Sequence, residues 1–112
     1  MKLLELSTEI NGTTVRLALN GELDIAGAAR VEQELERIER ESSTTIVLDL
    51  RELAFLDSTG LRVIVAADGR ARAQERRLVI VRGSATVQRI IEMTRLDERL
   101  EIVDDLAAVE AG

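Results

Sequence analysis

Hydrophobic and polar positions alternate at the start of the chain, which is the pattern of half-buried strands. Residues 4–10 alternate loosely, and residues 14–19 (TVRLAL) alternate cleanly. Between them lies Asn11-Gly12-Thr13, in which Asn and Gly tolerate the positive φ of a tight turn. The pattern predicts that two antiparallel strands open the fold.

The spacing then becomes helical. Val31, Leu35 and Ile38 are four and three residues apart, which places them on one face of a helix. Asp24 precedes this stripe, where its carboxylate is expected to accept a backbone N–H as an N-cap. A second helical stripe begins at Leu61 and is expected to end near Ala73.

Two segments are almost continuously aliphatic, residues 45–50 (TIVLDL) and 78–81 (LVIV), as in central strands buried on both faces. Ser84 follows as the expected N-cap of another helix. Residues 100–103 are expected to form a short edge strand, and Asp104-Asp105 to cap a terminal helix.

Strands that alternate with helices predict parallel pairing through crossover helices. The expected fold class is therefore α/β, with a mixed β-sheet, an N-terminal hairpin and helices mainly on one face. A length of 112 residues is typical of one domain, so residues 1–112 are expected to form a single domain.

The composition excludes the common routes of catalysis. The chain contains neither histidine nor cysteine, so it lacks the usual general base, a thiolate nucleophile and the commonest metal ligands. Neither a Gly-x-Ser-x-Gly elbow nor a phosphate-binding loop is present. We therefore expect no enzymatic activity, no metal and no cofactor.

Net charge and hydropathy limit the kinds of binding partner and the cellular compartment that we expect for this protein. A net charge of −6 argues against direct binding to nucleic acid. No apolar run approaches the roughly 20 residues that span a bilayer, and the N-terminus lacks the features of a signal peptide. A cytoplasmic protein without membrane insertion is expected.

One motif remains for function, FLDSTGLRVIVA at residues 55–66. It places Asp57-Ser58-Thr59-Gly60 where a strand feeds a helix, and helix N-terminal N–H groups favour negative charge. A phosphate on Ser58 would be tolerated there and would concentrate charge on a small patch. The simpler interpretation is that these residues only cap and shape the start of the helix.

Three segments in this order and spacing resemble the bacterial anti-sigma factor antagonists, which are standalone STAS domains. They are Gly21-Glu22-Leu23-Asp24, the strand at residues 46–50, and Phe55-Leu56-Asp57-Ser58-Thr59-Gly60-Leu61. The resemblance covers nearly the whole chain and implies the STAS fold.

The resemblance also implies a function. Members of this family bind an anti-sigma factor, often a serine kinase, and so free a sigma factor for transcription. The kinase phosphorylates the serine of the motif, which abolishes binding, and a serine phosphatase restores it. Carried onto this chain, the phosphoacceptor is Ser58. The implied partner-binding residues are Asp24, Asp57, Ser58, Thr59, Gly60, Leu61 and Arg62.

Two alternatives belong to other classes. The chain could be a constitutive STAS subunit of a stress-signalling scaffold or of a lipid-transport complex, in which Ser58 needs no modification. It could also be a sensor of a nucleotide or another small ligand at the same helix N-terminus.

The chain departs from the family pattern at three places. Arg62 replaces a small residue and lies four residues after Ser58, so it is either a solvated arginine or a side chain that reaches a phosphate. Residues 74–76 and Arg95 stand where glycine often ends a helix. Because left-handed backbone costs a non-glycine residue about 1–2 kcal/mol, we predict altered turn geometry without a positive φ at Arg95.

Overall fold

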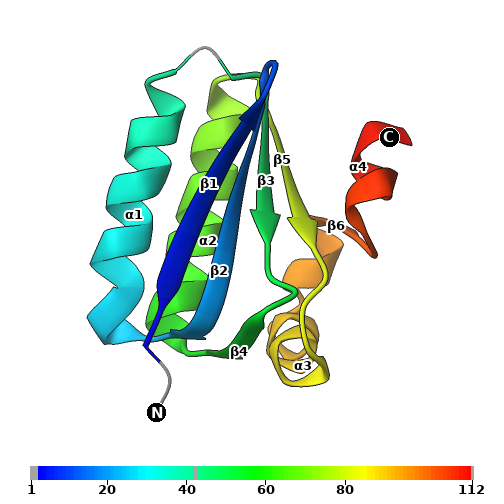
Figure 1. Cartoon of the computed structure of the whole chain (residues 1–112). Helices are drawn as coiled ribbons and strands as arrows, with labels where there is room; N and C mark the ends of the chain where they lie inside the picture. The colour runs from blue at the N-terminus through cyan, green and yellow to red at the C-terminus, as the bar shows by residue number, and fades with distance from the viewer. Residues whose placement is uncertain (1–2, 42, 112) are drawn as a thin grey trace.

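A mixed β-sheet with helices on both faces forms the part of the chain that the structure describes, residues 3–41 and 43–111 (Figure 1). In this computed structural model the elements follow in the order β1 Glu5–Asn11, β2 Thr14–Leu23, α1 Ile25–Glu39, β3 Thr45–Asp49, β4 Leu53–Leu56, α2 Ser58–Ala73, β5 Arg77–Val81, α3 Ala85–Met93, the 3-10 helix η1 Leu96–Glu98, β6 Glu101–Val103 and α4 Leu106–Ala111. The predicted α/β class is confirmed.

The sheet combines one antiparallel hairpin with parallel crossovers. Its strands lie in the order β1-β2-β3-β5-β6, and β4 pairs with the end of β2. β1 and β2 are antiparallel and are joined at Gly12, whose φ of 63° glycine adopts easily. Every other strand pair is parallel, with α1, α2 and α3 as connections. The expected hairpin and parallel core are both confirmed.

β2 is longer than its alternating pattern predicts. The expected strand ended at Leu19, whereas the strand continues through Gly21 to Leu23. Gly21 has a φ of 115°, and the register shifts between Gly21 and Glu22. The pairing of β2 with β3 ends at Ala18, and from Gly21 onward β2 pairs with β4, which extends it to the start of α1.

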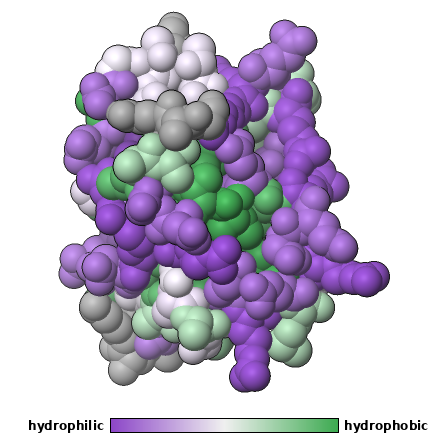
Figure 2. Space-filling view, turned by 90° about the vertical axis from the view of Figure 1, so that its right-hand side faces the viewer, coloured by the Kyte–Doolittle hydropathy of each residue, from purple (hydrophilic) through white to green (hydrophobic). Residues whose placement is uncertain are grey.

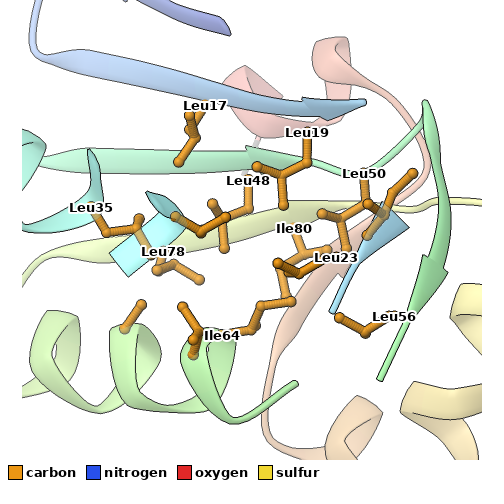
Figure 3. Close-up of a cluster of buried hydrophobic side chains, with 14 of the residues drawn as sticks. Leu17, Leu19, Leu23, Leu35, Leu48, Leu50, Leu56, Ile64, Leu78 and Ile80 are labelled. Carbon is orange, nitrogen blue, oxygen red and sulfur yellow. The ribbon is translucent and has the colours of Figure 1, made fainter. Parts of the chain in front are cut away.

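The main core fills the space between the sheet and the helices α1, α2 and α3. Figure 3 shows leucine and isoleucine side chains of the strands pointing toward Ile64 of α2 and Leu35 of α1. The only aromatic residue, Phe55, is outside this core and 40% exposed. The core is therefore entirely aliphatic, and it anchors α1 and α2 side by side on one face of the sheet (Figure 1).

The opposite face of the sheet carries a smaller apolar cluster beneath α4. Its buried members are Val47, Val79, Val81 and Val109. On the side viewed in Figure 2, the most strongly hydrophobic surface lies in the middle of a mostly hydrophilic face, with paler patches toward the edges of the view. Arg77 holds the end of α4 by donating to the Val109 carbonyl at 2.8 Å. The expectation of helices mainly on one face is confirmed, with α4 as the exception.

A buried carboxylate lies on this same face at the end of β3. Asp49 is 4% exposed and accepts hydrogen bonds from Arg51 at 2.7 and 2.9 Å and from Arg16 at 2.9 Å. Burial raises the pKa of Asp49, but the two guanidinium groups outweigh burial and hold that pKa below its ordinary value. Asp49 is thus a paired structural charge.

The prediction for Arg95 is wrong. Arg95 has a φ of 60°, and Glu75, after the preceding helix, has a φ of 56°. At Glu75 the helix end is closed by two hydrogen bonds, from the Arg76 N–H to the Ala71 carbonyl at 2.8 Å and from the Glu75 N–H to the Arg72 carbonyl at 3.2 Å. The Arg95 N–H similarly donates to the Glu92 carbonyl at 3.0 Å. These bonds satisfy helix-end carbonyls and offset the cost of left-handed backbone.

A test of the packing between β1 and α1 uses Glu34. Hydrogen bonding to Arg37 lowers the pKa of Glu34 to about 2 against the opposing effect of burial, and Thr8 adds a further hydrogen bond. Because the folded-state pKa is depressed, the stabilisation is complete above the unfolded value of 4.5 and is lost as pH falls through about 2. We expect Glu34→Gln to be less stable than wild type near neutral pH and to approach it in acid. Urea unfolding between about pH 6 and about pH 2.5 measures this.

The matched control is Glu36→Gln, which changes an exposed carboxylate on α1 that forms no hydrogen bond or salt bridge with the described residues. A constant difference between wild type and Glu34→Gln across the acid range would contradict the linkage.

Candidate functional site

Two parallel strands end beside each other and each feeds a helix. Leu23 at the end of β2 is in register with Leu56 at the end of β4, and the Asp57 N–H donates to the Leu23 carbonyl at 3.1 Å. Asp24 and Asp57 follow these strands directly and precede α1 and α2. The two helix N-termini therefore lie together at one edge of the sheet, beside β4 (Figure 1).

Both aspartates are N-caps. Asp24 has extended backbone and its Oδ1 accepts the Ala26 N–H at 3.0 Å. Asp57 has extended backbone and its Oδ1 accepts the Gly60 N–H at 2.8 Å. The cap predicted at Asp24 is confirmed, and in the motif at residues 57–60 the capping is done by Asp57.

Ser58 is the first residue of α2 and is exposed. Because Asp57 supplies the cap, the Ser58 hydroxyl is not needed to satisfy the helix. Among the residues that the structure describes, none forms a hydrogen bond with Ser58 Oγ. The hydroxyl is therefore accessible and chemically uncommitted.

The three residues after Ser58 turn inward. Thr59 is half-buried, while Gly60 and Leu61 are buried. A Cβ on Gly60 would come within 2.6 Å of Leu23 Cγ and 2.8 Å of Leu56 Cδ1. Gly60 thus allows α2 to begin against the ends of β2 and β4, and Leu61 packs in the core. Of the predicted partner-binding residues, these two are not available for direct contact.

Arg62 lies one turn after Ser58 and is exposed. Its side chain forms no hydrogen bond or salt bridge with any residue that the structure describes. On the same helix, by contrast, Arg70 is paired with Glu39 at 2.8 Å and Arg72 with Asp68 at 2.9 Å.

Two exposed apolar side chains, Ile25 and Phe55, were not among the predicted partner-binding residues. Ile25, the first residue of α1, is 76% exposed, and Phe55 of β4 is 40% exposed. Ile25 lies on a different face of α1 from Val31, Leu35 and Ile38. An apolar residue outside the buried face of a helix was therefore the signal that could have identified Ile25. For Phe55 the signal was a lone aromatic residue beside the motif.

The hollows on the surface are either distant from Ser58 or small. The largest, about 510 Å³, lies beneath α4 and is lined by residues at the starts of the parallel strands, such as Thr14, Thr45 and Arg77. Ser58 follows β4, whose last residue is in register with the last residue of β2, so Ser58 lies at the opposite end of β2 from this hollow. Within the described residues, no group of three or more acidic side chains is placed to hold a metal ion, and no helix is long and apolar enough to cross a bilayer.

Comparison with known proteins identifies the family. The model of the STAS domain matches residues 5–109. The chain belongs to the STAS domain family. Within this family the chain groups with the anti-sigma factor antagonists, which are a regulatory class. It is 31% identical over 106 residues to the anti-sigma-F factor antagonist RsfB of Mycobacterium tuberculosis. The match covers 91% of this chain and 85% of RsfB.

Solved structures agree with the STAS fold. An anti-sigma factor antagonist from Mycobacterium paratuberculosis superposes with a TM-score of 0.90 at 23% identity, covering 97% of this chain and 92% of that one. The phosphorylated form of the Bacillus cell fate determinant SpoIIAA superposes with a TM-score of 0.73 at 21% identity, covering 97% and 98%. The predicted family and fold are both confirmed.

The close approach at Gly60 gives a stability prediction. We expect Gly60→Ala to lower the free energy of unfolding by about 1–3 kcal/mol, because its methyl group must displace the buried side chains of Leu23 and Leu56. Gly69→Ala, in the same helix, meets nothing within 4 Å and should raise that free energy by about 0.5–1 kcal/mol. Urea denaturation of both variants measures the contrast. A rise in the free energy of unfolding of the same size in both variants would show that Gly60 has no packing role.

Proposed function

We propose that the protein is a phosphorylation-controlled anti-sigma factor antagonist of the cytoplasm. In its unphosphorylated form it binds an anti-sigma factor that is also a serine kinase, and thereby frees a sigma factor for transcription. Phosphorylation of Ser58 switches binding off, and a serine phosphatase restores it. The observation that carries this proposal is the exposed Ser58 hydroxyl, left uncommitted by the Asp57 cap.

The docking surface proposed for the partner consists of Asp24, Ile25, Phe55, Asp57, Ser58, Thr59 and Arg62, which belong to or adjoin the paired ends of β2 and β4. Ile25 and Phe55 supply exposed apolar area, while the aspartates and Arg62 supply charge. An interface of this kind buries apolar side chains at its centre and uses charge to select the partner.

A phosphate at Ser58 would alter this surface without unfolding the chain. It adds about −1.5 to −2 charges at neutral pH, next to the Asp57 carboxylate. The N-terminus of α2 favours negative charge, so the helix tolerates the group. The partner would have to desolvate and neutralise that charge, and the affinity falls accordingly.

The chemistry of the switch belongs to the partners. The kinase transfers the γ-phosphoryl group of its ATP to Ser58 Oγ, releases ADP and accepts the serine proton. The phosphatase transfers the phosphoryl group to water and returns the free hydroxyl. This chain contributes an accessible oxygen at a fixed position, which requires neither histidine nor a metal on its own side.

Two further observations support the assignment. RsfB is named as an antagonist of the anti-sigma-F factor, and it matches over most of both chains. SpoIIAA has been solved in an unphosphorylated and a phosphorylated form, each with the same fold as this chain.

The test begins with the partner captured from a lysate of the source organism and then purified. We expect Ser58→Ala to bind it like wild type with and without ATP, whereas wild type should lose affinity on incubation with Mg-ATP as Ser58 gains one phosphate. Ser58→Glu should weaken binding at least about tenfold, since one carboxylate imitates a phosphate only in part. Calorimetry and mass spectrometry of the modified peptide give the two readouts.

The matched control is Ser7→Glu, which places the same charge at an exposed serine of β1, outside the proposed docking surface. Equal binding of wild type, Ser58→Glu and Ser7→Glu would eliminate Ser58 as the switch. Capture of transporter or scaffold subunits by wild type and Ser58→Glu alike would instead establish a constitutive structural role.

A further inference from the structure

Most arginines in the described part of the chain are committed to a hydrogen bond or an ion pair. The exceptions are the side chains of Arg40, Arg62 and Arg89. Arg40 follows the end of α1 and Arg89 lies on α3, whereas Arg62 lies in the second turn of α2. The first two turns of α2 contain no other basic residue. Arg62 is therefore the uncommitted guanidinium on the helix that begins with Ser58.

The helix aims this guanidinium toward Ser58. Residues four apart on a helix lie on one face, with Cβ atoms about 5–6 Å from each other. Long helical side chains point back toward the N-terminus and lie over the preceding turn. Ser58 and Arg62 are both exposed, so neither side chain is held in the core. An arginine fork there matches the oxygens of a phosphate.

The two helix caps beside Ser58 are acidic. Asp57 precedes Ser58, and Asp24 caps the neighbouring helix. The N–H groups of Ser58 and Thr59 have no acceptor among the described residues. A dianion on Ser58 would thus lie next to the Asp57 carboxylate, and Arg62 is the cation one turn further along the same helix.

We propose that Arg62 is an internal receptor for the phosphate on Ser58, which rests on the proposed function because it takes Ser58 as the modified residue. In the phosphorylated protein the Arg62 guanidinium binds the phosphate oxygens along α2. Phosphorylation then changes the docking surface twice: it adds negative charge at Ser58, and it withdraws the positive charge of Arg62 from the partner.

The test uses protein with phosphoserine inserted at position 58 during translation, so that no kinase or partner is needed. Phosphorus NMR follows the phosphate through its second ionisation near pH 6, where the absence of histidine leaves no imidazole to titrate. In Arg62→Gln we expect the midpoint of the phosphate titration to rise by about 0.2–0.4 pH units relative to the unsubstituted phosphoprotein, the shift that corresponds to an exposed i,i+4 ion pair. Arg62→Lys should lie between the two.

The matched control is Arg89→Gln, which removes an equally uncommitted, exposed arginine from α3. Its titration should coincide with that of the unsubstituted phosphoprotein. In the unsubstituted protein the Arg62 Nε–H resonance should also move on phosphorylation, and about 1 M salt should reduce the midpoint difference. A merely solvated or structural arginine would not give this salt-sensitive shift.

Coincident titrations of the Arg62→Gln and unsubstituted phosphoproteins, with an unmoved Arg62 resonance, would overturn the role of Arg62 while leaving the proposed function intact. An equal midpoint shift in Arg89→Gln would also overturn it, because the effect would then be one of net charge. Conversely, a normal Arg62 shift in a protein whose partner ignores Ser58 would sustain the contact and refute the switch.

Discussion

Three residue pairs between the end of β2 and the short strand β4 hold the candidate site together. They place the ends of the parallel strands β2 and β4 beside each other, so that α1 and α2 begin at the same edge of the sheet. β2 pairs with β3 only as far as Ala18, and its last part, which includes the irregularity between Gly21 and Glu22, pairs with β4. The buried Gly60 then lets α2 begin directly against both strand ends. Without this pairing, Asp24 and Asp57 would cap unrelated helices.

Separation of roles within Asp57-Ser58 is what makes the serine available. A serine at a helix start is ordinarily occupied as a cap, and a hydroxyl engaged in that way is a poor acceptor for a phosphoryl group. Here the carboxylate of Asp57 performs the capping and the hydroxyl of Ser58 remains exposed. Under the proposed function, fold stability and regulation would therefore depend on adjacent but different side chains, so that modification of the serine would leave the cap in place.

An aliphatic core supports this arrangement from below. Leu23 and Leu56 are fully buried beneath the helix starts, and Ile64 fixes α2 against the sheet (Figure 3). Such rigid support would matter for the proposed switch, because a phosphate on a mobile loop could move aside. On the other face of the sheet, the charges of Asp49 are already paired with Arg16 and Arg51. On α2, by contrast, the uncommitted guanidinium of Arg62 lies one turn after the uncommitted hydroxyl of Ser58.

The sequence by itself determined what depends on neighbours along the chain: the opening hairpin, the period of each helix, the caps at Asp24 and Ser84, and the motif that contains Ser58. Only the tertiary structure decided what depends on distant segments. It extended β2 to meet β4, buried Gly60 and Leu61, and exposed Ile25 beside the site. It also held Arg95 in left-handed backbone, which its own preference disfavours. The periodicity of the sequence indicates which face of a segment is apolar. The pairing between distant segments then determines what that face packs against.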